Sequence, residues 1–175
     1  MEGVQVSPLH PRRIARALLV GAALVASSGC SSEGGDLEGS VSALIDLHYE
    51  RAEAQWSPGE LAISFITPQG SGVNTVLKVS AVVGDMIPEG YTGPLDINLA
   101  EVLGDGAQRG AVGRSVLDEP ARTFPQLEVG ALKVGSTATE PGSRITGDFH
   151  VTFVNGTDVF SGRTIFGSFE ATVQQ

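Results

Sequence analysis

The stretch "ITGDFHVTFVNGTDVFSG", residues 145–162, decides the fold class. Its first half alternates apolar and polar residues, so that Phe149, Val151 and Phe153 share one face, as in a strand with one buried side. Asn155-Gly156 then precedes a second run, Asp158 to Ser161. Asn-Gly between such runs favours a type I′ turn, because that turn needs φ > 0 at both central residues. The stretch therefore predicts a β-hairpin.

The same alternation recurs along the chain, with turn-forming residues between the runs. It sets these residues on apolar faces: Leu61, Ile63 and Phe65; Val73, Thr75, Leu77, Val79 and Ala81; Leu95, Ile97 and Leu99; and Leu127 and Val129. Strands with one apolar and one polar face are typical of antiparallel sheets packed on a single core. The sequence thus predicts an all-β domain, an antiparallel β-sandwich of jelly-roll or immunoglobulin-like type.

An internal echo marks the C-terminal part. "GDFHVTF" (Gly147 to Phe153) and "GSFEATV" (Gly167 to Val173) share the pattern Gly-x-Phe-x-small-Thr-apolar. We predict two similar strands of one sheet, flanking a strand over residues 158–161. Glycine inside a strand usually marks a bulge or a close backbone approach, which we therefore expect at Gly147 and Gly167.

Residues 41–56, "VSALIDLHYERAEAQW", fit two periodicities. Val41, Ala43, Ile45, Leu47 and Tyr49 alternate as in a strand, whereas Val41, Leu44, Ile45, His48, Ala52 and Trp56 have helical spacing. We favour one long, bent strand over a helix.

The only cysteine of the chain, Cys30, follows an export-type segment. Arg12, Arg13 and Arg16 precede an apolar run of ten residues from Ala17 to Ala26. A basic segment, a short apolar run and small residues describe a secretory signal, and the run is shorter than the roughly 20 residues of a membrane span. We expect ordinary secretion, followed either by cleavage near a spare thiol or by lipidation of Cys30.

Ala26, Ser27, Ser28, Gly29 and Cys30 resemble the end of a bacterial lipoprotein signal. Gly29 and Cys30 match the last two positions of the lipobox, although Ser27 stands where that family usually has leucine. The resemblance implies a diacylglycerol on Cys30, with palmitate-type acyl chains as membrane anchor, and cleavage after residue 29. Ser31 after the cysteine implies the outer membrane, the alternative being the periplasmic face of the inner membrane. The C-terminal strands also resemble uncharacterised bacterial lipoprotein domains, a likeness that implies no active site.

Three segments follow from this reading. Residues 1–29 form the signal peptide, residues 30–40 the lipidated cysteine and a flexible Ser/Gly/acid tether, and residues 41–175 one β-sandwich domain. The net charge of −9 becomes more negative once the arginines of residues 1–29 are removed. Such a surface disfavours nucleic acid as a partner. We expect a monomer that meets the membrane through its lipid, with an envelope protein or a glycan as a further partner.

Two Asp-x-His pairs are the main candidates for chemistry: Asp46 with His48, and Asp148 with His150. Residues two apart in a strand share a face, so side-by-side strands would bring two imidazoles and two carboxylates to a transition metal. Alternation by itself also places these residues on the solvent-exposed face of the strands, without any metal. We therefore expect neither a metal nor another cofactor.

The amphipathic aromatic residues Tyr49, Trp56 and Tyr91 are candidates for a sugar platform. Three functions follow: a non-enzymatic envelope lipoprotein with a structural or binding surface, which we favour; a small-molecule or glycan-binding module; and a metal-dependent enzyme. A concave apolar pocket ringed by these aromatic residues would favour the second, and clustered histidines the third.

Overall fold

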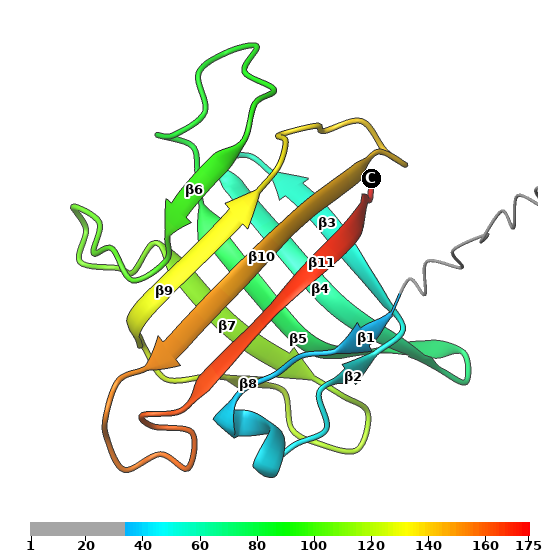
Figure 1. The fold of residues 1–175 in the computed structure, drawn as a ribbon, viewed down its shortest axis with the longest axis vertical. Helices are drawn as coiled ribbons and strands as arrows, with labels where there is room; N and C mark the ends of the chain where they lie inside the picture. Colours follow the sequence, from blue (N-terminus) through cyan, green and yellow to red (C-terminus); the bar gives the residue numbers. More distant parts are fainter. Residues whose placement is uncertain (1–33) are drawn as a thin grey trace, which may run out of the picture. The chain divides into compact units, whose positions relative to one another are not determined.

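The computed structural model describes residues 34–175, which form an all-β domain (Figure 1). A single 3₁₀-helix, η1 (Ser40–Ala43), lies near the start of the described region. The strands are β1 (Gly35–Asp36), β2 (His48–Tyr49), β3 (Arg51–Ser57), β4 (Glu60–Gln69), β5 (Gly72–Val82), β6 (Leu95–Asn98), β7 (Gly110–Ser115), β8 (Arg122–Thr123), β9 (Leu127–Val134), β10 (Arg144–Phe153) and β11 (Thr164–Val173).

Nine of the strands form one continuous sheet in the order β6-β9-β10-β11-β3-β4-β5-β7-β8, and β1 and β2 form a separate pair. The sheet is mixed rather than antiparallel, because β11 runs parallel to β3, with Ala171 opposite Ala52. Figure 1 shows the sheet bent so that β9, β10 and β11 lie in front of β4, β5 and β7. The all-β prediction is confirmed, whereas the two separate sheets of an immunoglobulin-like or jelly-roll sandwich are not.

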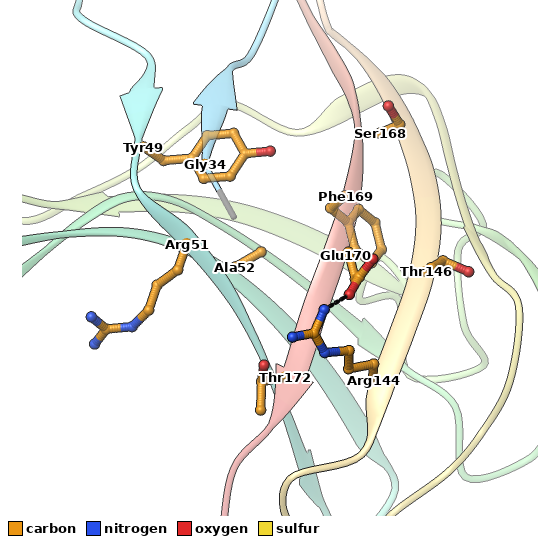
Figure 2. A pocket seen from close by; sticks show the side chains of 10 residues that line it. All are labelled: Gly34, Tyr49, Arg51, Ala52, Arg144, Thr146, Ser168, Phe169, Glu170 and Thr172. Atoms are coloured by element: carbon orange, nitrogen blue, oxygen red, sulfur yellow. Dashed lines mark hydrogen bonds and ion pairs between the residues drawn. The ribbon is translucent and has the colours of Figure 1, made fainter. Parts of the chain in front are cut away.

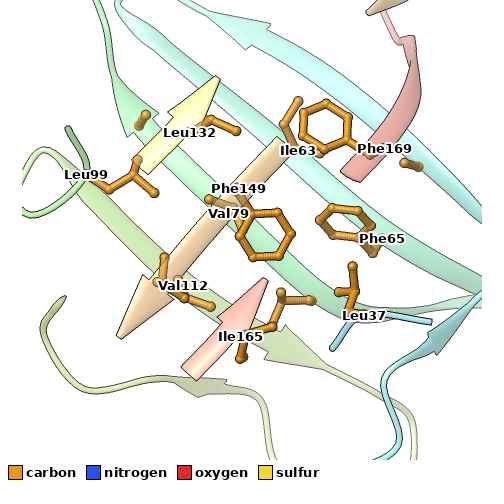
Figure 3. Packing of buried hydrophobic residues seen from close by; sticks show 14 of the residues in the cluster. Leu37, Ile63, Phe65, Val79, Leu99, Val112, Leu132, Phe149, Ile165 and Phe169 are labelled. Atoms are coloured by element: carbon orange, nitrogen blue, oxygen red, sulfur yellow. The ribbon is translucent and has the colours of Figure 1, made fainter. Parts of the chain in front are cut away.

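The core fills the space between these two layers (Figure 3). Phe65 of β4 is fully buried and lies 5.4 Å from Phe149 and 5.9 Å from Phe169 between ring centroids. The predicted inward faces of β4, β6 and β10 are confirmed. Val129, in contrast, is 52% exposed, because an irregular register between β9 and β10 at Thr152/Phe153 turns it outward. Val73 is also exposed, at the tip of the β4–β5 hairpin.

The two layers meet at a seam formed by residues 99–101. The Leu99 N–H donates to the Gly130 carbonyl of β9 at 2.9 Å, and the Gly110 N–H of β7 donates to the Leu99 carbonyl at 2.8 Å. A Cβ added at Gly110 would lie 2.5 Å from the Leu99 Cβ, and one added at Gly130 would lie 2.9 Å from the same atom. Both glycines therefore make room for the fully buried Leu99.

The side chain of Gln108 extends this seam. Its amide nitrogen donates to the Leu127 carbonyl at 2.7 Å, and its amide oxygen accepts the Leu127 N–H at 2.8 Å. The side chain thus takes the place of a neighbouring strand and satisfies backbone groups at the start of β9.

The C-terminal hairpin is confirmed, but its predicted turn is wrong. Strands β10 and β11 pair directly, and residues 154–163 form a longer loop instead of a type I′ turn with a strand over residues 158–161. Gly162, with φ of 69°, has the left-handed backbone in this loop. The reason is Phe160, which is buried against Phe124 at a centroid distance of 4.8 Å. Burying Phe160 requires a loop long enough to reach the core.

The repeated Gly-x-Phe pattern places the two strands in reciprocal contact. Gly147 lies opposite Phe169, and Phe149 lies opposite Gly167. A Cβ at Gly147 would lie 2.1 Å from the Lys133 carbonyl oxygen, and one at Gly167 would lie 2.7 Å from Leu37 Cδ2. The predicted close backbone approach is therefore confirmed at Gly147, whereas the close neighbour of Gly167 is a side chain.

The start of the domain lies earlier than predicted. Leu37 is 2% exposed, and the backbones of Glu38 and Phe166 exchange two hydrogen bonds of 2.9 Å. The flexible tether predicted over residues 30–40 is therefore wrong from Gly35 onward. Residues 41–56 are not one long strand either, because η1 precedes β2 and β3.

Candidate functional site

A groove of about 490 Å³ lies between the β5–β6 loop, residues 83–94, and the β9–β10 loop, residues 135–143. Its volume falls within the range of small-molecule sites, about 300–1,000 Å³. Trp56, near the end of β3, contributes to the lining. The remaining lining residues come from the two loops: Ile87, Pro88, Glu89, Gly90, Tyr91, Thr92, Thr137, Ala138, Thr139 and Glu140.

A tight turn shapes the first wall of the groove. The Tyr91 N–H donates to the Pro88 carbonyl at 3.0 Å, and Gly90 has φ of 75°. A type II turn requires a positive φ at its third residue, which is Gly90 here, and glycine adopts this φ without strain. The Tyr91 hydroxyl donates to the Pro94 carbonyl at 2.7 Å, which fixes the ring over Gly93.

Hydrogen bonds join the two walls. The buried Thr137 hydroxyl donates to the Tyr91 carbonyl at 2.8 Å. The indole N–H of Trp56 donates to the Ala138 carbonyl at 2.9 Å. Both aromatic side chains therefore donate their polar hydrogens to backbone carbonyls, and the half-buried Trp56 ring also packs against the core. The ring surface that still lines the groove is what a ligand can contact. The groove is formed before any ligand arrives.

Arg109 fixes the base of the β5–β6 loop. This side chain is 4% exposed and donates to both carboxylate oxygens of Asp85 at 2.7 and 2.8 Å, to Glu101 at 2.8 Å and to the Val82 carbonyl at 2.8 Å. The hydrogen bonds from Arg109 lower the pKa of Asp85 to about 2. The loop therefore leaves β5 in a direction set by a buried, fully paired guanidinium.

A second cavity, of about 320 Å³, lies where β11 and β3 diverge around β1 (Figure 2). Its charged side chains are paired: Arg144 with Glu170, and Arg51 with Glu53 at 3.0 Å. Burial raises the pKa of the Tyr49 hydroxyl at its edge, and the charge of Asp36 raises it further. Paired charges leave this cavity without a group prepared for chemistry, so we do not favour it as the site.

The structure does not bring the two Asp-x-His pairs together. The His48 ring of β2 pairs with Asp36 through Nδ1 at 3.0 Å, and the backbone N–H of His48 donates to Asp46 Oδ1 at 2.9 Å. Asp148 and His150 lie on β10, with His150 beside Phe166 of β11. Strands β11 and β1 lie between the two histidines, and residues 34–175 contain no cluster of three or more His, Cys, Asp or Glu side chains suited to a metal.

The structure places the three aromatic candidates in two different environments. Trp56 and Tyr91 line the groove, and Tyr91 is 39% exposed. Tyr49 is only 7% exposed and packs edge-on against Phe65 at 5.0 Å, so it belongs to the core. The predicted lipid site, Cys30, lies outside the described residues.

Sequence reasoning missed the second wall of the groove, Thr137 to Glu140. These residues lie in a turn-rich segment, "GSTATEPGS", that carries no motif. Their place beside Trp56 depends on a contact between residues 82 positions apart in the chain. Comparisons of the chain with protein-family models, with curated proteins and with solved structures found no match.

Proposed function

We propose that this protein is a non-enzymatic binding module of the bacterial cell envelope, and that the groove between the two loops holds a small organic molecule or a glycan fragment. The observation that carries the proposal is that Trp56 and Tyr91 both line one preformed, largely apolar groove. Preformed walls lower the entropic cost of binding, because no loop has to be ordered by the ligand. This favours ligand binding over a purely structural role.

The test uses Trp56 as its own reporter, because it is the only tryptophan in the sequence. Full-length chain is titrated with soluble glycan fragments and small organic molecules while Trp56 emission is followed. Tyr91→Ala should weaken binding of any active compound about five- to tenfold, whereas Val129→Ala, an exposed change on β9, should not. If no compound alters the emission, or if both variants bind equally, the proposal is wrong.

We further propose that a lipid on Cys30 holds the module at the outer membrane. Within residues 34–175 the structure has no helix with the length and apolarity needed to cross a bilayer. Metabolic labelling with a fatty-acid analogue should mark the wild-type chain and not Cys30→Ala, and only the wild type should fractionate with outer-membrane markers. Equal labelling of both chains would contradict lipidation at Cys30, and co-fractionation with inner-membrane markers would contradict the outer-membrane assignment.

A further inference from the structure

The groove has a charge as well as a shape. Glu89 comes from one wall and Glu140 from the other, and both side chains are exposed at the groove. The described residues that line it include no Lys, Arg or His. Arg109, the nearby cation at the base of the first loop, is already paired with Asp85 and Glu101. Two acidic residues therefore line the groove, and the described lining residues include no basic residue to offset their charge.

From this combination we infer that the groove binds an organic cation, a methylated ammonium group attached to a small apolar body. The inference rests on the proposed function, since it names the ligand class of the same groove. Aromatic faces attract a cation through the ring quadrupole, best at tryptophan. Trp56 and Tyr91 supply two rings, and Glu89 and Glu140 supply the opposite charge.

Methylation of the ligand nitrogen is inferred from the apolar part of the lining. A primary ammonium could donate to Glu89 or Glu140, but it would lose part of its hydration against the apolar wall, which costs free energy. N-methyl groups need no acceptor and make apolar contacts with Ile87 and Pro88, which also line the groove.

Charge complementarity excludes the opposite class of ligand. An anion would lose its hydration and meet two carboxylates, which is unfavourable in a partly enclosed site. A neutral ligand would contact the same rings but would gain no charge attraction from Glu89 and Glu140. The net charge of the chain, −9, adds a weak long-range attraction for cations.

Choline and 3,3-dimethyl-1-butanol test this directly, because they have nearly the same shape and differ in charge. Binding to full-length chain is measured by Trp56 emission and by calorimetry, with tetramethylammonium as a second cation and glucose as a neutral sugar. Choline should bind about fivefold more tightly than its neutral isostere, the ratio expected for a cation on exposed aromatic faces.

The carboxylates are tested by the Glu89→Gln/Glu140→Gln double variant. We expect it to weaken choline binding about three- to tenfold and to leave the neutral isostere unchanged. Glu128→Gln, at an exposed position on β9, is the matched control and should bind choline as the wild type does. Raising the salt concentration should weaken choline binding in the wild type more than in the double variant.

The outcomes separate this inference from the proposed function. If choline and its isostere bind equally, or if only glucose binds, the groove is still a ligand-binding site but the inference that it prefers an organic cation is wrong. Choline binding that the double variant does not weaken overturns the role of the carboxylates. If no compound binds, neither in this set nor among the glycan fragments, both proposals fail together.

Discussion

Gly147→Ala tests the close approach between β9 and β10. A Cβ at this position would lie 2.1 Å from the Lys133 carbonyl oxygen and 2.6 Å from Phe169 Cζ, whereas ordinary contact begins at 3.4 Å. The phenylalanine ring can rotate away, but the carbonyl belongs to the backbone of a paired strand. Relief would therefore require β9 to retreat by roughly 1 Å in a close-packed sheet.

We expect Gly147→Ala to lower the free energy of unfolding by about 3 kcal/mol, at the upper end of the usual cost of overpacking. For a domain of this size the midpoint temperature should fall by about 10 °C. Urea unfolding and thermal melting, both followed by far-ultraviolet circular dichroism, measure the two quantities.

Gly104→Ala is the matched control. No heavy atom lies within 4 Å of a Cβ at Gly104, and its φ is outside the left-handed region. Its stability should stay within about 0.5 kcal/mol of the wild type or rise slightly, because alanine restricts the unfolded chain. Equal stability of the two variants would refute the close approach. Recovery of Gly147→Ala by an added Phe169→Leu would show that the ring, rather than the β9 backbone, is the obstacle.

Caesium should quench Trp56 emission more than iodide does, relative to neutral acrylamide, and the Glu89→Gln/Glu140→Gln variant should narrow that difference; equal quenching in both proteins would contradict a negative groove. Because the pKa of Asp85 in the folded state, about 2, lies below its unfolded value near 4, its pairing with Arg109 stabilises fully above about pH 4 and is lost as the pH falls through 2. Urea unfolding should accordingly show Asp85→Asn less stable than wild type at pH 6, with the gap closing toward pH 2, and a constant gap would be inconsistent with this linkage. Gln108→Glu replaces the donor to the Leu127 carbonyl with an acceptor and should cost about 2 kcal/mol in urea unfolding, whereas the exposed Gln126→Glu should cost little; similar losses would argue against the seam.

The groove and the hydrogen bonds of Arg109 are connected through the β5–β6 loop. Arg109 fixes Asp85 at the start of the β5–β6 loop, and Thr137 fixes Tyr91 further along it. The rings of Trp56 and Tyr91 are held by backbone carbonyls rather than by each other. A ligand therefore meets walls whose positions depend on the sheet below them.

Local pattern in the sequence was enough to predict the core-facing side chains of β4, β6 and β10, although it misplaced Val73 and Val129. Leu61, Ile63 and Phe65 of β4 are buried as the alternation indicates, because a strand sends successive side chains to opposite faces wherever it lies. The close backbone approach at Gly147 was predictable for a similar reason, since glycine inside a strand usually marks a bulge or a close approach. Trp56 and Tyr91 were identified as aromatic candidates, although nothing local placed them in one groove.

Only the tertiary structure decided which segments are neighbours. The parallel pairing of β11 with β3, the insertion of Leu99 between Gly110 and Gly130, and the approach of the two groove loops all join residues far apart in the chain. The type I′ turn at Asn155-Gly156 failed for the same reason, because burial of Phe160 in the distant core outweighed a local preference. Alternation specifies the face of a strand, whereas its partner is chosen by the packing of the whole core, in which many weak long-range contacts act together.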